Sequence, residues 1–317
     1  MGTDRVQTRL LRVLPARRLQ RHWVDLFDAA IEMGCTAFDT ASSYRGGDAE
    51  RLLGRWSADA GVRDQIIVVT KGGMPRAGRS TMTPAVIAED LETSLRRLRR
   101  DYVDLYLLHR DDPLADVPAL LEALASHRRA GKIRAYGLSN WEIPRVAMAV
   151  AEARTRDLPP PSAVSVQLSL ASWQAAPFPG LTSLSGSTPE ARSGRSWLAT
   201  RDLALLAYSP LARGFLTRSG SVASAARRGA DARWQAAYDL PANFARLDRA
   251  RELARIRGVS PPEIALAYVL SQGPNIFAVV GVKDPGKLGA CVGACRLTLS
   301  EDEVRWLEGA APQPGSV

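Results

Sequence analysis

The feature that most constrains this chain is a repeated unit in which a short apolar run is followed by an amphipathic stretch. Most of these runs lie roughly 30 to 40 residues apart, which is the period of a βα unit. Near-continuous apolar runs such as Ile66–Val69 suit parallel strands that are covered on both faces. The predicted strands are Ala37–Thr40, Ile66–Thr70, Val103–His109, Ile133–Leu138, Ala163–Leu168, Ala204–Tyr208 and Phe277–Val282.

The length of the chain fits one closed arrangement of such units. A (β/α)8 TIM barrel takes roughly 250 residues plus insertions, and the chain has 317. We therefore expect an α/β fold with a single (β/α)8 barrel domain over residues 1–317. The eighth strand must precede the first helix, and Leu10–Leu14 is the candidate within an atypical N-terminal segment, residues 1–20.

Helix signals and loop signals fall between the predicted strands. A helical stripe over His22–Met33 stops at Gly34, and Thr83-Pro84 and Ser260–Glu263 carry start signals for two further helices. Residues 175–195 are rich in Pro, Ser and Gly, and residues 213–241 have an irregular pattern. We expect both segments to form loops on the pocket side of the barrel.

The basic composition raises the question of a nucleic-acid partner. The formal net charge is +9, carried by four Lys and thirty-eight Arg that are spread along the whole length. No nucleic-acid recognition motif is present, so we expect no nucleic-acid partner and a positive field that helps to attract a polyanionic cofactor.

Cysteine usage and hydropathy point to a reducing compartment. The three cysteines suggest no disulfide framework, and three scattered histidines make no metal-ligand cluster. No stretch has the length of a membrane span, and the Arg-rich N-terminus lacks the apolar block of a secretory signal. The expectation is a cytoplasmic protein with no metal and no membrane contact.

Four chemically active side chains stand where predicted strands end. They are Asp39, Tyr44, Lys71 and His109. In a parallel barrel the strand ends that face one way form the active site, so these groups are expected to converge.

The four groups together suit general acid catalysis on a carbonyl. A phenol has a reference pKa near 10, and a neighbouring ammonium lowers that value. Asp39 would hold the Lys71 ammonium by a charge-assisted bond, and His109 would orient the carbonyl oxygen toward Tyr44. No side chain supplies hydride, so a nicotinamide cofactor is implied.

The chain resembles the aldo-keto reductase superfamily from about Trp23 to Leu307. The resemblance rests on Phe38–Ala41 with Tyr44, on Thr70–Gly72, on the long segment Asp101–Arg110 and on Gly131–Asn140. It implies a (β/α)8 barrel that reduces an aldehyde or ketone with NADPH, with Tyr44 as the general acid.

The resemblance also implies cofactor-binding residues. Ser139, Asn140 and Gln167 would bind the nicotinamide carboxamide, and Tyr208 would stack on the nicotinamide ring. The stretch Ser209–Gly214 would wrap the pyrophosphate. The site residues taken from this stretch are Ser209, Leu211, Arg213 and Gly214.

The last βα turn bears on the choice between NADPH and NADH. Gly281, Lys283 and Lys287 match the stretch that grips the adenosine 2′-phosphate, and the two cations favour NADP(H). The chain departs from many relatives at Ala290 and Cys291, and its first 20 residues lack the Gly-rich first strand and the hairpin that relatives carry.

Other interpretations stay open from the sequence. Trp141 and Trp173 are candidate walls of the substrate pocket, with packing as the alternative. A short tail after Leu307 suggests a bulky substrate, as in secondary metabolism. A cofactor-binding regulatory subunit that resembles potassium-channel β subunits, or a barrel that uses bound cofactor for dehydration or isomerisation, would share these motifs. The oligomeric state is not indicated.

Overall fold

The computed structural model describes residues 1, 16–74, 82–217 and 230–313. The predicted eighth strand, Leu10–Leu14, lies outside the described residues, as does most of the atypical segment 1–20. The chain forms two units, which are described separately. Unit 1 comprises Met1–Ser165 with Gly281–Pro285, and unit 2 comprises Val166–Val280 with Gly286–Val317.

Seven strands lie among the described residues, in the order of the chain. Every register that the structure gives is parallel, and the order β1 to β7 is that of a (β/α)8 barrel, as predicted. The last predicted strand, Phe277–Val282, is observed as Ile276–Val279. The strands are β1 (Ala37–Asp39), β2 (Ile67–Gly72), β3 (Val103–Leu108), β4 (Ile133–Ser139), β5 (Ala163–Gln167), β6 (Ala204–Tyr208) and β7 (Ile276–Val279).

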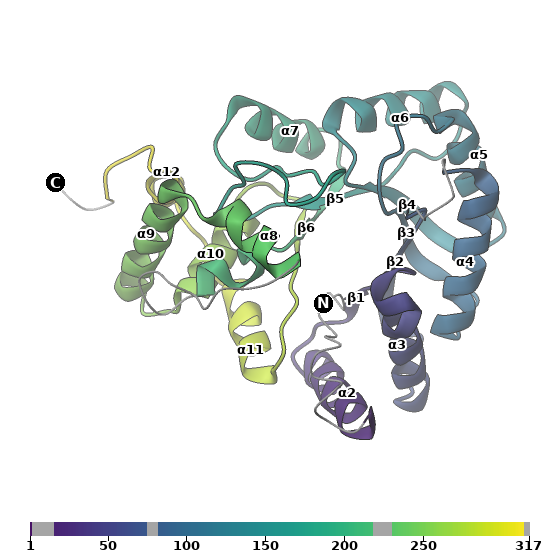
Figure 1. Ribbon diagram of the computed structural model, residues 1–317, viewed down its shortest axis with the longest axis horizontal. Coiled ribbons are helices and arrows are strands. Elements are labelled where there is room, and N and C mark those ends of the chain that lie inside the picture. Colours follow the sequence, from purple (N-terminus) through teal and green to yellow (C-terminus); the bar gives the residue numbers. More distant parts are fainter. Residues whose placement is uncertain (2–15, 75–81, 218–229, 314–317) are drawn as a thin grey trace. The chain divides into compact units, whose positions relative to one another are not determined.

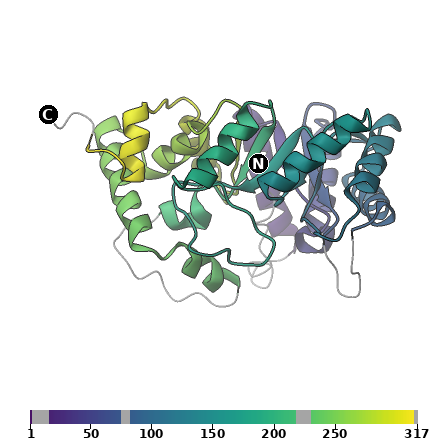
Figure 2. The same ribbon diagram turned by 90° about the horizontal axis from the view of Figure 1, so that it is seen from above.

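Helices alternate with these strands. Unit 1 contains α2 (Ala16–Glu32), the 3-10 helix η1 (Tyr44–Gly47), α3 (Asp48–Asp59), α4 (Pro84–Leu98), α5 (Val117–Arg129) and α6 (Ile143–Thr155). Unit 2 contains α7 (Pro189–Ala199), η2 (Ala212–Thr217), α8 (Ala230–Tyr238), α9 (Pro241–Arg257), α10 (Pro261–Leu270), α12 (Glu301–Glu308) and most of α11 (Pro285–Ala294). In Figure 1 and Figure 2, α4 and α5 lie along one side of strands β2 to β4.

The helix starts follow the local signals in the sequence. The Thr83 side chain accepts a hydrogen bond from the Val86 N–H at 3.3 Å, which caps α4. Ser260 and Glu263 form a capping box at the start of α10, with the Ser260 N–H donating to Glu263 Oε2 at 2.9 Å.

Both predicted loop segments contain helices. Within 175–195, Thr188 caps α7 by accepting from the Ala191 N–H, and Pro189 occupies the first turn, so the irregular stretch ends at Thr188. Within 213–241, the described residues include part of η2 and the whole of α8.

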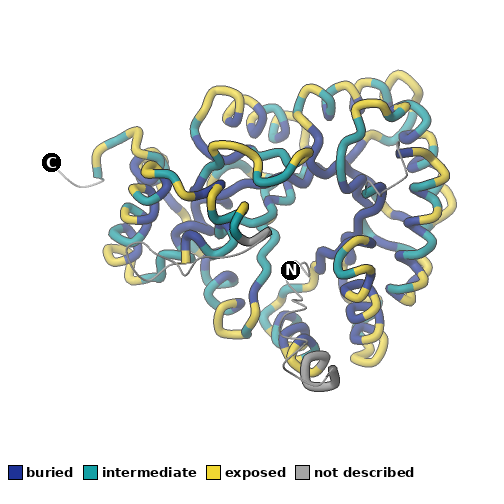
Figure 3. Tube along the Cα trace, viewed as in Figure 1, coloured by how far each residue is buried: buried dark blue, intermediate teal, exposed yellow. Residues whose placement is uncertain are grey.

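In unit 1 the strands form a buried inner layer and the helices are half exposed, whereas in unit 2 no residue of β7 is buried and α10 is buried over Ile264–Val269. For unit 1, Figure 3 shows buried residues along the strands and on one face of the helices, with exposed residues on the opposite face. Phe38, Tyr106 and Val164 are fully buried on β1, β3 and β5. Among the described residues, no helix has both the length and the apolar character that a membrane crossing requires.

The register in unit 1 brings several strand ends to one edge. Asp39 pairs with Val69, Lys71 with Leu107, and Leu107 with Gly137. The His109 N–H donates to the Gly72 carbonyl at 2.8 Å, which continues the ladder past β3. The side chains that leave β1 to β4 at this edge are therefore neighbours.

Candidate active site

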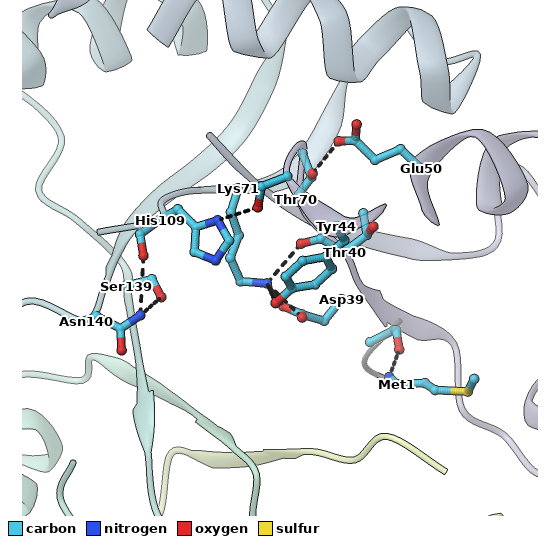
Figure 4. A network of polar contacts seen from close by, with 12 residues as sticks. Met1, Asp39, Thr40, Tyr44, Glu50, Thr70, Lys71, His109, Ser139 and Asn140 are labelled. Atoms are coloured by element: carbon cyan, nitrogen blue, oxygen red, sulfur yellow. Dashed lines mark hydrogen bonds and ion pairs between the residues drawn. The ribbon is translucent and has the colours of Figure 1, made fainter. Parts of the chain in front are cut away.

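Lys71 is the centre of a buried polar cluster at this edge. Its ammonium donates to both carboxylate oxygens of Asp39 at 2.7 Å and to the Thr40 carbonyl at 2.9 Å, and it lies 3.4 Å from the Tyr44 hydroxyl. Only 3% of Lys71 and 7% of Asp39 is exposed, so the pair is shielded from water. Figure 4 shows the three side chains converging. The ammonium therefore has the carboxylate and the phenol as direct neighbours.

His109 adds an imidazole to the cluster. Its ring meets the Tyr44 ring edge to face, with centroids 5.7 Å apart, and its Nδ1 lies 3.3 Å from the Ser43 hydroxyl. Burial lowers the pKa of His109 well below its usual value, and the charges of Lys71 and Arg110 lower it further. Both effects favour the neutral form of the imidazole.

The loop from β1 to η1 holds Tyr44 in place through its backbone. The Thr40 N–H donates to the Val69 carbonyl at 2.8 Å, and the Ser42 N–H donates to the Lys71 carbonyl at 2.9 Å. Directly after Tyr44, Arg45 and Gly46 adopt left-handed φ angles of 54° and 63°. The chain thus turns sharply at the phenol before α3 begins.

A second network, which the sequence analysis missed, supports the same loop. Glu50 is fully buried; one of its oxygens accepts from the Thr70 hydroxyl at 2.7 Å, and the other lies 3.2 Å from Arg97 Nη1. Arg97 also donates to the Ser42 carbonyl at 3.0 Å. The network ties the residue before Lys71 to the loop that carries Tyr44.

A signal for this network was present in the sequence. On α3, Glu50, Leu53, Gly54 and Ser57 share the 3, 4 and 7 spacing of one helix face, and all four are buried. A carboxylate on an apolar face is expected to have a charged or hydrogen-bonding partner.

The end of β4 places Ser139 and Asn140 beside His109. The Asn140 amide donates to the His109 carbonyl at 3.3 Å and to the Ser139 hydroxyl at 3.0 Å. Asn140 has a left-handed φ of 60°, which asparagine tolerates better than most residues. Both predicted cofactor residues are thus adjacent to the buried polar cluster in unit 1.

Trp141 packs behind this edge. It is 1% exposed, and its indole N–H donates to the Arg110 carbonyl at 3.2 Å. The Arg145 guanidinium lies 5.0 Å from its ring centroid and pairs with Asp111 at 2.7 Å. The contribution of Trp141 to a substrate pocket stays a prediction.

The remaining predicted cofactor residues on strands β5 and β6 lie in unit 2. The buried Gln167 amide donates to the Ser169 hydroxyl at 2.8 Å, and its oxygen accepts from the Ser185 hydroxyl at 2.7 Å and from the Ser183 hydroxyl. Tyr208 is half-buried at the end of β6.

The stretch after Tyr208 has an unusual backbone. Ser209, Ala212 and Arg213 have φ angles of 52°, 47° and 52°, and Gly214 has 95°. Ala212, Arg213 and Gly214 follow one another, and the Ala212 and Gly214 N–H groups donate to the Ser209 and Leu211 carbonyls at 2.8 and 2.9 Å. Leu211 lies within this stretch and is half-buried.

Trp173 belongs to an aromatic cluster of unit 2. Its ring meets Trp234 and Tyr238 edge to face, with centroids 5.6 and 6.3 Å apart. Burial raises the pKa of the Tyr238 phenol, and the Trp173 indole lowers that pKa in part. The structure places Trp173 on a half-buried surface, and its predicted contact with substrate is untested.

The residues of the last βα turn lie around the start of α11. Gly281 is half-buried and Lys283 is exposed, both in unit 1, and the exposed Lys287 lies in the first turn of α11 in unit 2. Their roles toward an adenosine phosphate stay predictions.

Comparison with known proteins shows similarity to the aldo-keto reductases. A model described as the Aldo/keto reductase family matches residues 19–311. An aldo-keto reductase of Schizosaccharomyces pombe, yakc, whose name carries NADP(+), is 30% identical over 89% of this chain and 80% of its own length. An aldo-keto reductase of Strobilurus tenacellus, str7, is 32% identical over 88% of this chain and 78% of its own length.

Solved structures agree on the fold. A thermostable aldo-keto reductase in complex with the inhibitor epalrestat has a TM-score of 0.71 and 24% identity, covering 94% of this chain and 89% of that one. An aldo/keto reductase from Klebsiella pneumoniae in complex with NADP and acetate has a TM-score of 0.68 and 24% identity, covering 93% and 87%.

Proposed function

The chain belongs to the aldo/keto reductase family of NAD(P)H-dependent oxidoreductases, and on this premise we propose that it reduces an aldehyde or ketone to an alcohol with NADPH. The observation that carries the proposal is the position of the Lys71 ammonium, 2.7 Å from both Asp39 oxygens and 3.4 Å from the Tyr44 hydroxyl. This arrangement suits a phenol that donates a proton and is left as a phenolate beside a cation.

Tyr44 is the proton donor in this proposal. When its hydroxyl gives a proton to the carbonyl oxygen, the negative charge that remains on the phenolate lies next to Lys71. Asp39 holds the ammonium in position through two charge-assisted bonds, so no reorganisation is needed during the reaction.

His109 orients the substrate. Its imidazole is neutral because burial, Lys71 and Arg110 all lower its pKa. With Nδ1 accepting from the Ser43 hydroxyl, Nε2 carries the hydrogen and donates it to the carbonyl oxygen. The polarised carbonyl then presents its oxygen to Tyr44.

The chain's own residues fit a nicotinamide dinucleotide. When bound, the reduced nicotinamide supplies the hydride that no side chain provides. Ser139 and Asn140 would hold its carboxamide beside His109. Gln167 would give up hydrogen bonds to its serine partners and bind the same carboxamide. Tyr208 would stack on the ring.

Phosphate binding is assigned to backbone and cations. The stretch Ser209–Gly214, which turns through several left-handed residues, would wrap the pyrophosphate. Lys283 and Lys287, with Gly281, would hold the 2′-phosphate that distinguishes NADPH from NADH. The NADP bound in the Klebsiella pneumoniae relative and the NADP(+) in the name of yakc support this choice.

The test is turnover on a panel of aldehydes and ketones, followed by loss of reduced-nicotinamide absorbance. Tyr44→Phe is expected to abolish reduction while the affinity for NADPH stays within twofold. Tyr102→Phe, which removes a hydroxyl that accepts from Arg134 away from the cluster, is the matched control and should keep full activity. Equal turnover by wild type and Tyr44→Phe would remove Tyr44 from its role.

A further inference from the structure

A hollow on the outer side of unit 1 is lined almost entirely by arginine. It lies between α3 and α4 and has a volume of about 460 Å³. Its lining residues are Arg51, Arg55, Thr93, Arg96, Arg97 and Arg99. Five arginines from two segments of the sequence thus lie around one hollow.

A close approach of two helix backbones brings these side chains together. A Cβ atom at Gly54 would lie 2.6 Å from the carbonyl oxygens of Arg97 and Leu98, so α3 crosses the end of α4 at a glycine. Arg51 and Arg55 flank Gly54 on α3 and face the last turn of α4 across this crossing.

Carboxylates neutralise only part of this charge. Asp48 pairs with Arg51 at 2.9 Å, and Glu50 pairs with Arg97 at 3.2 Å. Arg55 and Arg99 have no ion pair with any of the residues that the structure describes. Five guanidinium groups against two carboxylates leave an excess of three positive charges around one concave surface.

The usual structural reason for basic residues covers the three arginines at the end of α4 but not the two on α3. Cations at the end of α4 are stabilised by the negative end of the helix dipole. Arg51 and Arg55 lie within α3 at a spacing of four, where like charges destabilise a helix. An anion in the hollow would relieve this repulsion.

We propose that this hollow is a binding site for a compact anion with several phosphate groups, such as a short inorganic polyphosphate. Guanidinium groups form bidentate hydrogen bonds with phosphate oxygens, and several guanidinium groups converge here within reach of one ligand. The volume is that of a small-molecule site. An extended nucleic acid needs a continuous basic track, whereas this charge is confined to two helix segments.

The test is calorimetric titration of the full chain with tripolyphosphate at low and moderate salt. Wild type should bind one equivalent saturably. Arg51→Ser/Arg55→Ser should weaken binding at least tenfold. Arg97 is left unchanged because it also holds the Ser42 loop. The control, Arg251→Ser/Arg255→Ser, removes two charges at the same spacing from α9 and should keep the affinity within twofold.

Several results would overturn the proposal. Equal weakening in both double variants would mean that net charge alone binds the anion. Loss of tripolyphosphate binding in excess NADPH would place the anion in the cofactor site. Tighter saturable binding of a single-stranded oligonucleotide, lost in Arg51→Ser/Arg55→Ser, would make nucleic acid the partner. Circular dichroism checks that both variants fold, and none of these readouts depends on carbonyl reduction.

Discussion

Replacing Lys71 with methionine tests the electrostatic role of the ammonium. A unit charge 3.4 Å from the Tyr44 oxygen stabilises a phenolate there by about 5 kcal/mol at an effective dielectric constant of about 20. The Asp39 carboxylate offsets part of this, so we take half of that energy as the lower bound. With about 1.36 kcal/mol per decade of rate, kcat should fall between roughly 70-fold and 4,000-fold.

The same substitution also lowers stability, and a second variant separates that effect from the effect on kcat. Lys71→Met leaves the Asp39 carboxylate buried without its cation, a change that costs about 3–5 kcal/mol of stability. The double variant Asp39→Asn/Lys71→Met removes both charges, so it should regain most of the stability but none of the kcat.

The assay combines steady-state kinetics on the best carbonyl of the panel with urea unfolding and NADPH titration. NADPH affinity should change little, because the ammonium acts on the phenol. A Lys71→Met enzyme with kcat within tenfold of wild type would refute the electrostatic argument. A double variant that regains kcat together with stability would show that Lys71 serves only the fold.

Two further predictions concern Glu50 and His109. Glu50→Gln leaves Arg97 without its carboxylate partner, so the free energy of unfolding should fall by about 3 kcal/mol and kcat should drop more than KM rises; unchanged urea midpoints and kinetics would contradict the network. Because the lowered pKa keeps folded His109 neutral while the unfolded chain binds a proton, stability should decline as pH falls below about 6.5, by up to roughly 1.4 kcal/mol per pH unit. His109→Gln should flatten this decline in urea unfolding between pH 5 and 8, and parallel curves for both proteins would remove His109 as its source.

The barrel fold could be predicted because parallel buried strands leave a strong local signal. Runs such as Ile66–Val69 are apolar and recur at the period of a βα unit, and all seven predicted strands overlap observed ones. The α7 helix was missed because Ser, Pro and Gly around its start resemble a loop. The cap at Thr188 and the proline after it mark the change to helix.

The convergence of Asp39, Lys71 and His109 could be predicted because each lies at or next to the end of a strand, and Tyr44 follows β1 by a short loop. Their catalytic roles stay predictions. The partners of Glu50 could not be predicted, since nothing in the sequence states that Arg97 reaches across from another helix. The arginine hollow could not be predicted from the sequence either. Its residues come from two segments, and they meet because α3 packs closely against the end of α4 at Gly54.

Two consecutive residues of strand β2 contact different parts of the site. Thr70 turns to Glu50 on α3 while Lys71 turns to Asp39, because neighbouring side chains on a strand point to opposite faces. A single-residue deletion within β2 would exchange the two directions, sending the hydroxyl toward the phenol and the amine toward the helix. The position of each residue along β2 therefore matters as much as its chemical type.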